Sequence, residues 1–511
     1  MSKILILLFI PFVFLGQDGA FRYFISFNDK ADTSFSSDYP EQFLSKKTIA
    51  KRQKFSIAID STDLPVSSIY IDNIRLAGFV VENRSKWFNG VIVSTYDSLL
   101  TASLHYEFID TIIFFGSWQN TKEVTDKWRL DYDISDYGLA SNQLQMLAGD
   151  LMHSRGFKGN GITIAVIDAG FYNVDKLNVF SDLQNQISST YDFIDGNLNV
   201  YDDHDHGMMV LSTMGAKGIM TGSAPDADYI LLRSEDVFSE NLIEEYMWVC
   251  AAEYADSSGA DIINSSLGYT TFDDANQNHT YTDMDGNTTP ISIGAGIASD
   301  KGIIVVNSAG NSGNSAWHYI GAPADNFKVL TVGAVDVNEE FASFSSYGPN
   351  ANGDVKPNVV AQGKNAVVVN SNNEVITANG TSFSSPLTAG MIACLWSSNT
   401  DHSASSIKDA IYNTSDRYLD PDDQFGYGIP NYYSAYQYLN YDFTIPINGS
   451  ISDDVGYMVY TIDGKLIDSG ILYYNNIQEA VKIIKPKLPG IYIISLTADD
   501  FELSKKFIVF E

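Results

Sequence analysis

The sequence predicts an α/β protein whose largest part, residues 134–440, holds a parallel β-sheet with helices on both faces. Two observations lead to this prediction. Near-continuous apolar runs rich in β-branched residues alternate with helical periods: "ITIAVIDAG", "ADYILLR", "ADIINSSLG", "GIIVVNSAG" and "KVLTVGAVD". Such runs are typical of strands buried on both faces. The pattern begins near 134 and stops near 441, and a chain of 511 residues has room for two or three domains.

The first segment, residues 1–16, is predicted to be a signal peptide. One lysine precedes the apolar run 4–15 in "MSKILILLFIPFVFLG", which is too short to span a bilayer but typical of an export signal. We therefore expect the chain to be exported through the periplasm and secreted or held on the outer cell surface. No other stretch is long enough for a membrane span in the mature chain.

Residues 17–133 are predicted to form a small α+β unit. Strand-like alternation is present in "NGVIVSTY" and "YEFIDTIIFF", and "YPEQFLSKKTIAKRQKF" has a helical pattern. At the other end, residues 441–511 lose the helical pattern. The stretches "GYMVYTIDGKLIDSG" and "GIYIISLTADDFELSKKFIVF" predict a module of short antiparallel strands.

Charge and cysteine content restrict the class of protein. The chain has 63 acidic and 31 basic side chains, a net charge of −32, and residues 134–440 alone have 37 acidic and 11 basic side chains, or −26. Such a field opposes binding to nucleic acid or to anionic membranes. Cys250 and Cys394 are the only cysteines and lie in apolar helical patterns, so no disulfide framework supports the fold. Two buried thiols are favoured, with one disulfide as the alternative.

Four polar residues stand where the predicted strands end or the helices begin. Asp168 ends the first buried strand, His206 precedes a helical run, Asn311 follows a later strand, and Ser382 lies in "NGTSFSSP" before an apolar helix. Each has a plain structural interpretation, as a helix cap or a turn residue. One hydroxyl suffices for a cap, however, and "NGTSFSSP" has four. The excess keeps open the hypothesis that one serine is a nucleophile at the positive end of the helix.

Together these residues make a complete set for acyl transfer. Ligands in parallel sheets bind at the carboxyl ends of the strands, so we expect the four side chains to meet in one crevice. An acid can orient an imidazole, the imidazole can deprotonate a hydroxyl, and an amide can donate to the oxyanion. The four residues therefore predict a hydrolytic site better than four separate caps.

The order Asp168, His206, Ser382 and the blocks "VIDAG", "HGMMV", "SSLG", "AGN" and "GTSFSSP" resemble the subtilisin-like serine proteases, or subtilases. The resemblance extends over 159–428 and implies a subtilisin-like parallel sheet. It also implies that Asp168 orients His206, that His206 is general base and then general acid, and that Ser382 attacks the scissile carbonyl. Asn311 and the backbone N–H of Ser382 would then form the oxyanion hole.

The same resemblance implies how a substrate binds. Ser266, Leu267 and Gly268 of the "SSLG" block would pair with the substrate backbone. Ala309 and Gly310 would wall the pocket for the side chain that precedes the scissile bond. No cofactor is required by this chemistry.

Three positions differ from the pattern of the family or compete with it. Met208 replaces the usual threonine two residues after the catalytic histidine, and Phe383 replaces the usual methionine after the nucleophile. Neither change removes a catalytic atom. His204 is an alternative to His206 as the base, but only His206 is followed by a glycine and the helical run.

The flanking segments carry resemblances of their own. Residues 17–133 resemble the pro-segments of secreted bacterial subtilases, which assist folding and inhibit the enzyme until they are cut off; the polar stretch 117–138 is suited to cleavage. Residues 441–511 resemble the β-sandwich sorting domains that the type IX secretion machinery of certain Gram-negative bacteria reads. An ordinary β-sandwich that supports the enzyme or binds substrate is the alternative.

An insertion beside the expected cleft, residues 269–301, is polar and rich in aspartate. Oxygen ligands at this density can hold calcium, with a solvated loop as the simpler interpretation. Trp317 has two interpretations as well, as a pocket residue or as a core residue.

The leading functional hypothesis is a secreted serine endopeptidase that acts on proteins or peptides through an acyl-enzyme. One rival is a catalytically inactive surface binding protein with the same fold. The other is an enzyme that hydrolyses esters or matures one dedicated partner. The presence of all three triad residues and the amide argues against the first rival, and digestion of casein would separate general from dedicated proteolysis.

Overall fold

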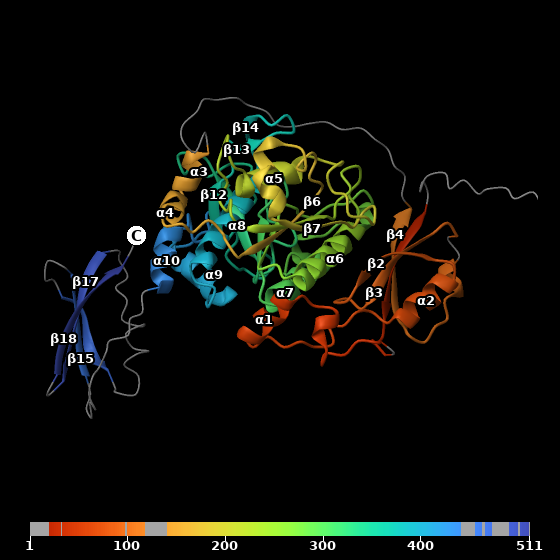
Figure 1. The fold of residues 1–511 in the computed structure, drawn as a ribbon, viewed down its shortest axis with the longest axis horizontal. Coiled ribbons are helices and arrows are strands. Elements are labelled where there is room, and N and C mark those ends of the chain that lie inside the picture. Colours follow the sequence, from red (N-terminus) through yellow and green to blue (C-terminus); the bar gives the residue numbers. More distant parts are fainter. Residues whose placement is uncertain are drawn as a thin grey trace, which may run out of the picture.

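The computed structural model describes residues 20–31, 33–97, 100–117, 140–440, 455–461, 466–472, 490–498 and 501–509 (Figure 1). The predicted signal peptide lies outside these residues, as do the boundaries predicted near 133 and 441 and most of the stretch predicted to be cleavable. These assignments stay predictions.

The N-terminal unit is an antiparallel sheet with helices, as predicted. Its four strands lie in the order β2-β3-β1-β4, and its own core is a cluster of Tyr, Phe, Ile and Val side chains. The helical pattern at 39–55 forms a 3-10 turn, η1, and the helix α1. The elements are β1 (Phe21–Phe27), η1 (Pro40–Gln42), α1 (Lys46–Lys54), α2 (Ser68–Leu76), β2 (Val80–Ser85), β3 (Gly90–Thr95), η2 (Leu100–Ser103) and β4 (Ile109–Ser117).

The central sheet has seven strands, and every described pairing between them is parallel. Their order, β12-β11-β10-β9-β6-β8-β7, places the first strand in sequence, β6, well inside the sheet. This arrangement confirms the predicted fold class. The strands are β6 (Thr163–Asp168), β7 (Ile187–Asp192), β8 (Asp228–Arg233), β9 (Ile262–Ser265), β10 (Ile304–Ser308), β11 (Leu330–Val335) and β12 (Val359–Gln362).

Helices cover both faces of this sheet because successive strand residues point to opposite sides. In β6, Ile164 and Val166 pack into a core with α5 and α8, whereas Ala165 and Ile167 pack into a second core with α6 and α7. The elements of this domain outside the central sheet include these four helices. They are α3 (Ser141–Gln145), α4 (Gly149–Ser154), η3 (Asn178–Phe180), η4 (Asp182–Asn185), α5 (His206–Gly215), α6 (Ile243–Ser258), η5 (Ala275–Gln277), η6 (Tyr281–Asp283), α7 (Pro290–Asp300), the hairpin β13 (Ala366–Val369) and β14 (Val375–Ala378), α8 (Thr381–Ser398), α9 (Ala404–Asn413) and α10 (Tyr432–Asn440).

The N-terminal unit packs on the α6 side of the large domain, where Figure 1 shows the two parts side by side. Trp87 and Phe115 enter the same apolar core as Tyr246 of α6, and burial of each aromatic ring contributes about 2 kcal/mol. Buried polar contacts also join the two parts. Nη2 of Arg52, a fully buried residue, lies 2.8 Å from Asp256 Oδ1 of α6. The Ser85 hydroxyl donates to Glu253 Oε1 at 2.6 Å.

The C-terminal strands form an antiparallel sheet in the order β16-β15-β17-β18. This confirms short antiparallel strands, while the second layer of a sandwich stays a prediction. The strands are β15 (Val455–Thr461), β16 (Leu466–Leu472), β17 (Gly490–Ala498) and β18 (Phe501–Val509).

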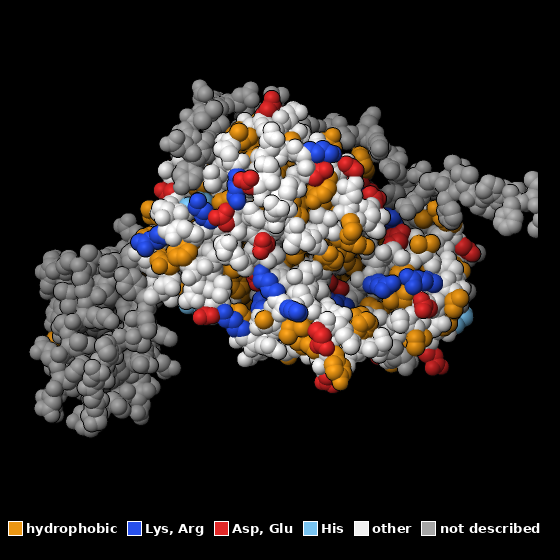
Figure 2. Space-filling model, viewed as in Figure 1, with side chains coloured by type: hydrophobic (Ala, Val, Ile, Leu, Met, Phe, Trp, Pro, Cys, Tyr) orange, Lys and Arg blue, Asp and Glu red, His pale blue; other side chains and the backbone are white. Residues whose placement is uncertain are grey.

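The two cysteines are free and buried. Cys250 on α6 and Cys394 on α8 belong to the two different cores, so the interpretation as free thiols is confirmed. Within the described parts of the chain, no helix combines the length and apolarity that a membrane crossing requires. On the face drawn in Figure 2, acidic and basic side chains are interspersed in small groups rather than gathered into one basic surface.

Candidate active site

A cavity of about 340 Å³ lies at the carboxyl ends of the central strands. It brings together residues that are far apart in the sequence, because β6, β9 and β10 end at the same edge of the sheet as α5 and α8 begin. Of the residues singled out from the sequence, those that line it are His204, His206, Ser266, Leu267, Gly268, Gly310, Asn311, Trp317 and Ser382.

Two of the singled-out residues lie behind the wall of the cavity. Asp168 is fully buried as the last residue of β6. Ala309 is also buried, in a small cluster with Ile320 and Ala324. The structure therefore places Gly310 at the cavity surface and Ala309 beneath it.

Asp168 and His206 form a hydrogen-bonded pair. His206 Nδ1 lies 2.7 Å from Asp168 Oδ1, which also accepts from the amide of Ala169 at 2.8 Å. The start of α5 lies so close to Asp168 and Gly170 that position 207 requires a glycine. A Cβ on Gly207 would lie 2.4 Å from the carbonyl oxygen of Gly170 and 2.9 Å from Asp168 Cβ. Since the carboxylate accepts at Nδ1, Nε2 is the nitrogen left to exchange a proton.

The electrostatic surroundings of His206 favour its protonated form. Burial opposes the charge and is the largest single influence, but the charge and hydrogen bond of Asp168, with smaller contributions from Glu235 and Asp205, outweigh it and raise the pKa of His206. A base with a raised pKa holds the abstracted proton more firmly. The pair thus has the properties of a general base that becomes a general acid.

His204 forms its hydrogen bond with the backbone of His206 rather than with Asp168. Its Nδ1 accepts a hydrogen bond from the backbone amide of His206 at 3.1 Å, and the two ring centroids are 6.5 Å apart. It lines the cavity, but the hydrogen bond to Asp168 belongs to His206.

Ser382 is the second residue of α8. Gly380, two residues before it, has a φ of +155°, which residues with a side chain rarely adopt. The backbone carbonyl of Ser382 accepts from the Ser266 hydroxyl at 2.9 Å, whereas the Ser382 hydroxyl makes no hydrogen bond with a described residue. Ser384 and Ser385 instead bond to Thr381 O and Asn264 Oδ1. The hydroxyls of Ser384 and Ser385 are therefore engaged with other groups of the protein, whereas Ser382 lines the cavity.

The side chain of Asn311 is held by the same turn. Its Oδ1 accepts from the amide of Thr381 at 2.9 Å and from the Thr381 hydroxyl at 3.0 Å, so Nδ2 is turned the other way. A Cβ placed on Gly380 would lie 3.7 Å from Asn311 Nδ2 and 3.6 Å from the backbone N of Ser382. Asn311 Nδ2 and the backbone N of Ser382 therefore both lie close to Gly380.

The positions that differ from the expected pattern have packing roles. Met208 is buried in the core behind α5. The ring centroid of Phe383 lies 6.1 Å from that of His206. Trp317 satisfies both interpretations, since it lines the cavity and also packs against the core around α6.

Sequence reasoning missed two carboxylates in the cavity wall, Glu235 and Glu240. Burial, opposed by a hydrogen bond from the Tyr269 hydroxyl and reinforced by the charge of Asp168, raises the pKa of Glu235 to about 7. The signal available in the sequence was the acidic run "SEDVFSENLIEE" between an apolar strand and an apolar helix.

The aspartates of the insertion 269–301 mostly close local turns. Asp274 accepts from the amide of Asn276, Asp283 from that of Thr280, and Asp285 from those of Asn287 and Thr288. The two groups of three carboxylates found among the described residues lie outside this insertion.

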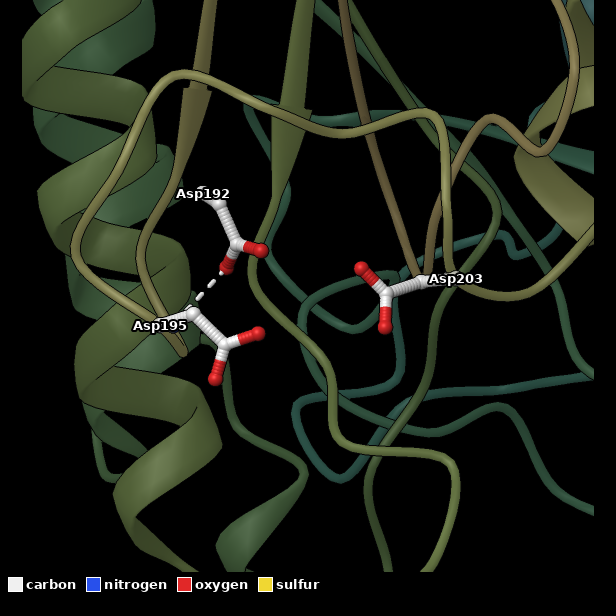
Figure 3. Close-up of side chains that lie close together, drawn as sticks. All are labelled: Asp192, Asp195 and Asp203. Carbon is white, nitrogen blue, oxygen red and sulfur yellow. Dashed lines mark hydrogen bonds between the residues drawn. The ribbon is translucent and has the colours of Figure 1, made fainter.

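One of those groups, Asp192, Asp195 and Asp203, faces a common space in Figure 3. Nη1 of Arg233 lies 2.8, 3.0 and 3.2 Å from the respective carboxylates. The protein thus supplies the cation for this group from its own chain.

Residues 159–428 match the model of the subtilase family, and residues 22–129 match that of the peptidase S8 propeptide domain of Bacteroidota. The thermophilic serine proteinase of Bacillus sp. (strain AK1) is 33% identical over 55% of this chain and 62% of its own. Serine protease AprX of Bacillus subtilis (strain 168) is 30% identical over 54% and 64%.

The matched region therefore covers less than two thirds of these two relatives. Subtilisin DY of Bacillus licheniformis is 28% identical over 58% of this chain and 97% of its own. Among solved structures, the epidermin leader peptide processing serine protease of Staphylococcus aureus has a TM-score of 0.56 at 19% identity, covering 82% of this chain and 99% of that one. This likeness shows the fold.

Proposed function

The chain belongs to the subtilase family, and from this premise we propose that it is a secreted serine endopeptidase that hydrolyses peptide bonds through an acyl-enzyme. The observation that carries the proposal is the hydrogen bond between Asp168 and His206 at the edge of a cavity that also holds Ser382. An oriented imidazole with a raised pKa and an uncommitted hydroxyl in the same cavity are what acyl transfer requires.

Each step of the reaction has a residue to perform it. His206 Nε2 takes the proton of the Ser382 hydroxyl as the oxygen attacks the scissile carbonyl, and Asp168 stabilises the imidazolium that forms. The oxyanion of the tetrahedral intermediate is bound by Asn311 Nδ2 and the amide of Ser382, two donors that both lie close to Gly380. His206 then protonates the leaving amine, and water repeats the sequence to release the acyl group.

The extended segment after β9 is proposed to bind the substrate backbone. Ser266, Leu267 and Gly268 line the cavity, and Gly310 forms the wall on the β10 side. Ala309, packed beneath Gly310, would support that wall. Protein and peptide chains are therefore the substrates we expect.

The rival function, an inactive binding protein, would not need a triad, whereas Asp168, His206 and Ser382 are all present and His206 pairs with Asp168. A dedicated maturation protease would use the same machinery on fewer substrates. Casein distinguishes the two, since a general endopeptidase digests it and a dedicated one does not.

The oxyanion role of Asn311 gives a direct test. We expect Asn311→Leu to lower turnover on casein-derived peptides roughly 10²- to 10³-fold with little change in KM, because one donor is lost only in the transition state. Asn311→Asp is the matched variant: it keeps the acceptor for Thr381 but loses the donor, and should be similarly slow while folding normally. Absence of peptidase activity in the wild-type chain would contradict the proposed function, and normal turnover in both variants would remove Asn311 from the mechanism.

The N-terminal unit is proposed to act as the inhibitor and folding aid of the enzyme. Its match to a propeptide model and its buried contacts with α6 support this role. Residues 1–16 would direct export, so that the protease acts outside the cell or on its surface.

The C-terminal sheet is proposed to be a sorting domain for type IX secretion. The break in sequence pattern near residue 441 and the separate antiparallel sheet support this assignment. Deletion of 441–511 should leave a folded, active enzyme that stays in the periplasm of a host with type IX machinery, as measured by fractionation and peptidase assay. Secretion of the truncated chain at the normal level would show that this region is not the sorting signal.

A further inference from the structure

Helix α6 is buried on all sides, whereas a helix at the edge of a domain usually keeps one polar face in water. Thirteen of its sixteen residues are buried. On the inner side, the indole N–H of Trp248 donates to the Ser265 hydroxyl of β9 at 3.0 Å, and Val249 packs against Gly294 of α7. The outer side is covered by the N-terminal unit, whose aromatic and aliphatic side chains belong to the same apolar core. The unit therefore completes the packing of this helix.

The N-terminal unit contacts the outer face of α6 at successive turns of the helix. The contacting residues of α6 recur at intervals of three or four positions, and they are Tyr246, Cys250, Glu253 and Asp256. This spacing places them on one side of the helix. Three rings of the unit surround Tyr246, with centroid distances of 4.8, 5.1 and 5.6 Å for Phe24, Phe115 and Phe88. Without the unit, the apolar side chains of this face would be exposed together, an arrangement that monomeric proteins rarely show.

The N-terminal unit also satisfies the C-terminal end of α6. The last carbonyls of a helix have no partner within the helix and carry a partial negative charge, and the last turn of α6 has no basic residue of its own. The Thr48 hydroxyl of α1 donates to the carbonyl of Asp256 at 2.7 Å. The amide of Ser45, the N-cap of α1, donates to the carbonyl of Ser257 at 2.8 Å. The end of one helix is therefore capped by the start of another.

These capping contacts lie at the amino ends of the central strands. Lys51 Nζ, which is buried, donates to the carbonyl of Ala260, two residues before β9, at 2.6 Å. Lys47 Nζ donates at 2.6 Å to the hydroxyl of Thr163, the first residue of β6. Asp168 of the candidate triad is the last residue of that same strand. Helix α1, drawn beneath the large domain in Figure 1, thus binds the end of the sheet opposite to the cavity.

A buried group of charges also connects the two parts. Nη2 of Arg52 lies 3.2 Å from Asp63 Oδ1 of its own unit and 2.8 Å from Asp256 Oδ1 of α6, and all three side chains are fully buried. Lys301, at the end of α7, reaches back to Asp63 Oδ2 at 2.9 Å. The charges therefore alternate in sign across the interface. Removal of one member of such a group is strongly destabilising, because its partner is left buried and unpaired.

The cavity is built without the N-terminal unit. None of the residues that line it belongs to the described part of that unit. The unit therefore packs and caps α6 without occupying the space that holds His206 and Ser382. A shared apolar core with fully buried polar contacts is typical of permanent interfaces, which resemble a domain core cut in two. The interface thus has the form of a lasting one, and it leaves the candidate active site open on its own side.

We propose that the N-terminal unit stays bound to the protease domain after the chain between them is cut, as a lasting subunit of the mature protein. It covers the outer face of α6 and holds the end of that helix through Ser45, Thr48 and Lys51, which we call the α1 clamp. This role begins after the cut, so it is separate from inhibition by the uncut chain, and it holds whichever protease makes the cut.

A full-length chain that can be cut at will tests the proposal. In Ser382→Ala, a recognition sequence for a site-specific protease is placed within the polar stretch 118–138, so that the cut does not require the chain's own activity. After the cut, we expect the two fragments to elute together in gel filtration. A dilution of about a hundredfold before the column should not separate them, because only a weak complex dissociates over that range.

Cys250 shows directly whether the unit has left α6. Its thiol donates to the carbonyl of Arg84 in β2 at 3.4 Å and is buried beneath the N-terminal unit. Cys394 lies in the other core and is the internal control for unfolding of the protease domain. We expect both thiols of the cut protein to resist a maleimide, with mass spectrometry of peptides to assign any label.

Variants assign the protection to the α1 clamp. Thr48→Val combined with Lys51→Met removes two buried donors to the end of α6 and keeps the shape of both side chains. In the cut protein, this double variant should raise the labelling rate of Cys250 at least about tenfold. Before the cut, the connecting chain holds the unit in place, so the uncut variant shows that it folds. The matched control is Lys54→Ala, which removes only an exposed ion pair of the same helix and should keep the rate of the unchanged clamp.

Three results would overturn the proposal. The first is separation of the two fragments after the cut, with or without labelling of Cys394. The second is an equal labelling rate of Cys250 in the double variant and in the unchanged clamp, because the clamp would then not hold the unit. The third is peptidase activity of the wild-type chain confined to fractions that lack the N-terminal unit. Absence of peptidase activity from every fraction would contradict the proposed function instead, and the binding measured in Ser382→Ala would still decide this proposal.

Discussion

Ser382→Ala is expected to lower peptide hydrolysis roughly 10⁶-fold, the loss typical of a removed triad nucleophile. The acyl-enzyme needs that one oxygen, and the other hydroxyls of the turn are committed, as with Ser384 to Thr381 and Ser385 to Asn264. Folding should be unaffected, because the contact between Ser266 and residue 382 is made by the backbone carbonyl. Turnover of a fluorogenic peptide and the thermal unfolding midpoint measure the two effects.

The same variant tests whether the enzyme releases its own N-terminal unit. We expect purified Ser382→Ala to persist as the uncut precursor, with that unit bound to α6 through Arg52 and Trp87. Addition of a small amount of active enzyme should then restore cleavage, which would show that the precursor is a competent substrate. Normal maturation of the variant with no other protease present would disprove self-processing. Undiminished digestion of casein would also remove Ser382 from the mechanism.

Asp168→Asn is expected to lower kcat roughly 10⁴-fold at neutral pH, because an orienting carboxylate is worth about that much in a serine triad. In the wild type Asp168 accepts at Nδ1 of His206 and so holds the proton there. An asparagine can present its N–H₂ group instead and favour the opposite tautomer, with Nε2 protonated and unable to act as a base.

The pH dependence of kcat/KM distinguishes this mechanism from misfolding. Activity requires neutral His206, so in the wild type it should fall as the pH drops through the raised pKa of that residue. In Asp168→Asn the charge that opposes the effect of burial is gone, so the residual activity should have its acid limb at lower pH. Asp228→Asn, at the opposite end of the adjacent strand β8, is the matched control and should keep the wild-type rate and profile. A wild-type profile in Asp168→Asn would contradict the assigned pairing.

The parts of this protein that follow local patterns could be read from the sequence. β-Branched runs such as 162–167 predicted the strands, since a strand buried on both faces is apolar at every position. The order Asp168, His206, Ser382 and the small residues around each motif predicted which strand ends and helix starts would converge. Their convergence follows from parallel strands sharing one edge, so the sequence alone determined the sheet and the residues of the candidate site.

Several features of the site and of the domain contacts depend on tertiary packing and correspond to no local pattern in the sequence. Tertiary packing placed Gly310 at the cavity surface and Ala309 beneath it, and it gave the aspartates at 192–203 an arginine from β8. It also joined Arg52 to Asp256 across 204 positions of the chain. The physical reason is that burial and charge compensation depend on which distant segments pack together, and a side chain's own neighbours in sequence do not specify those segments.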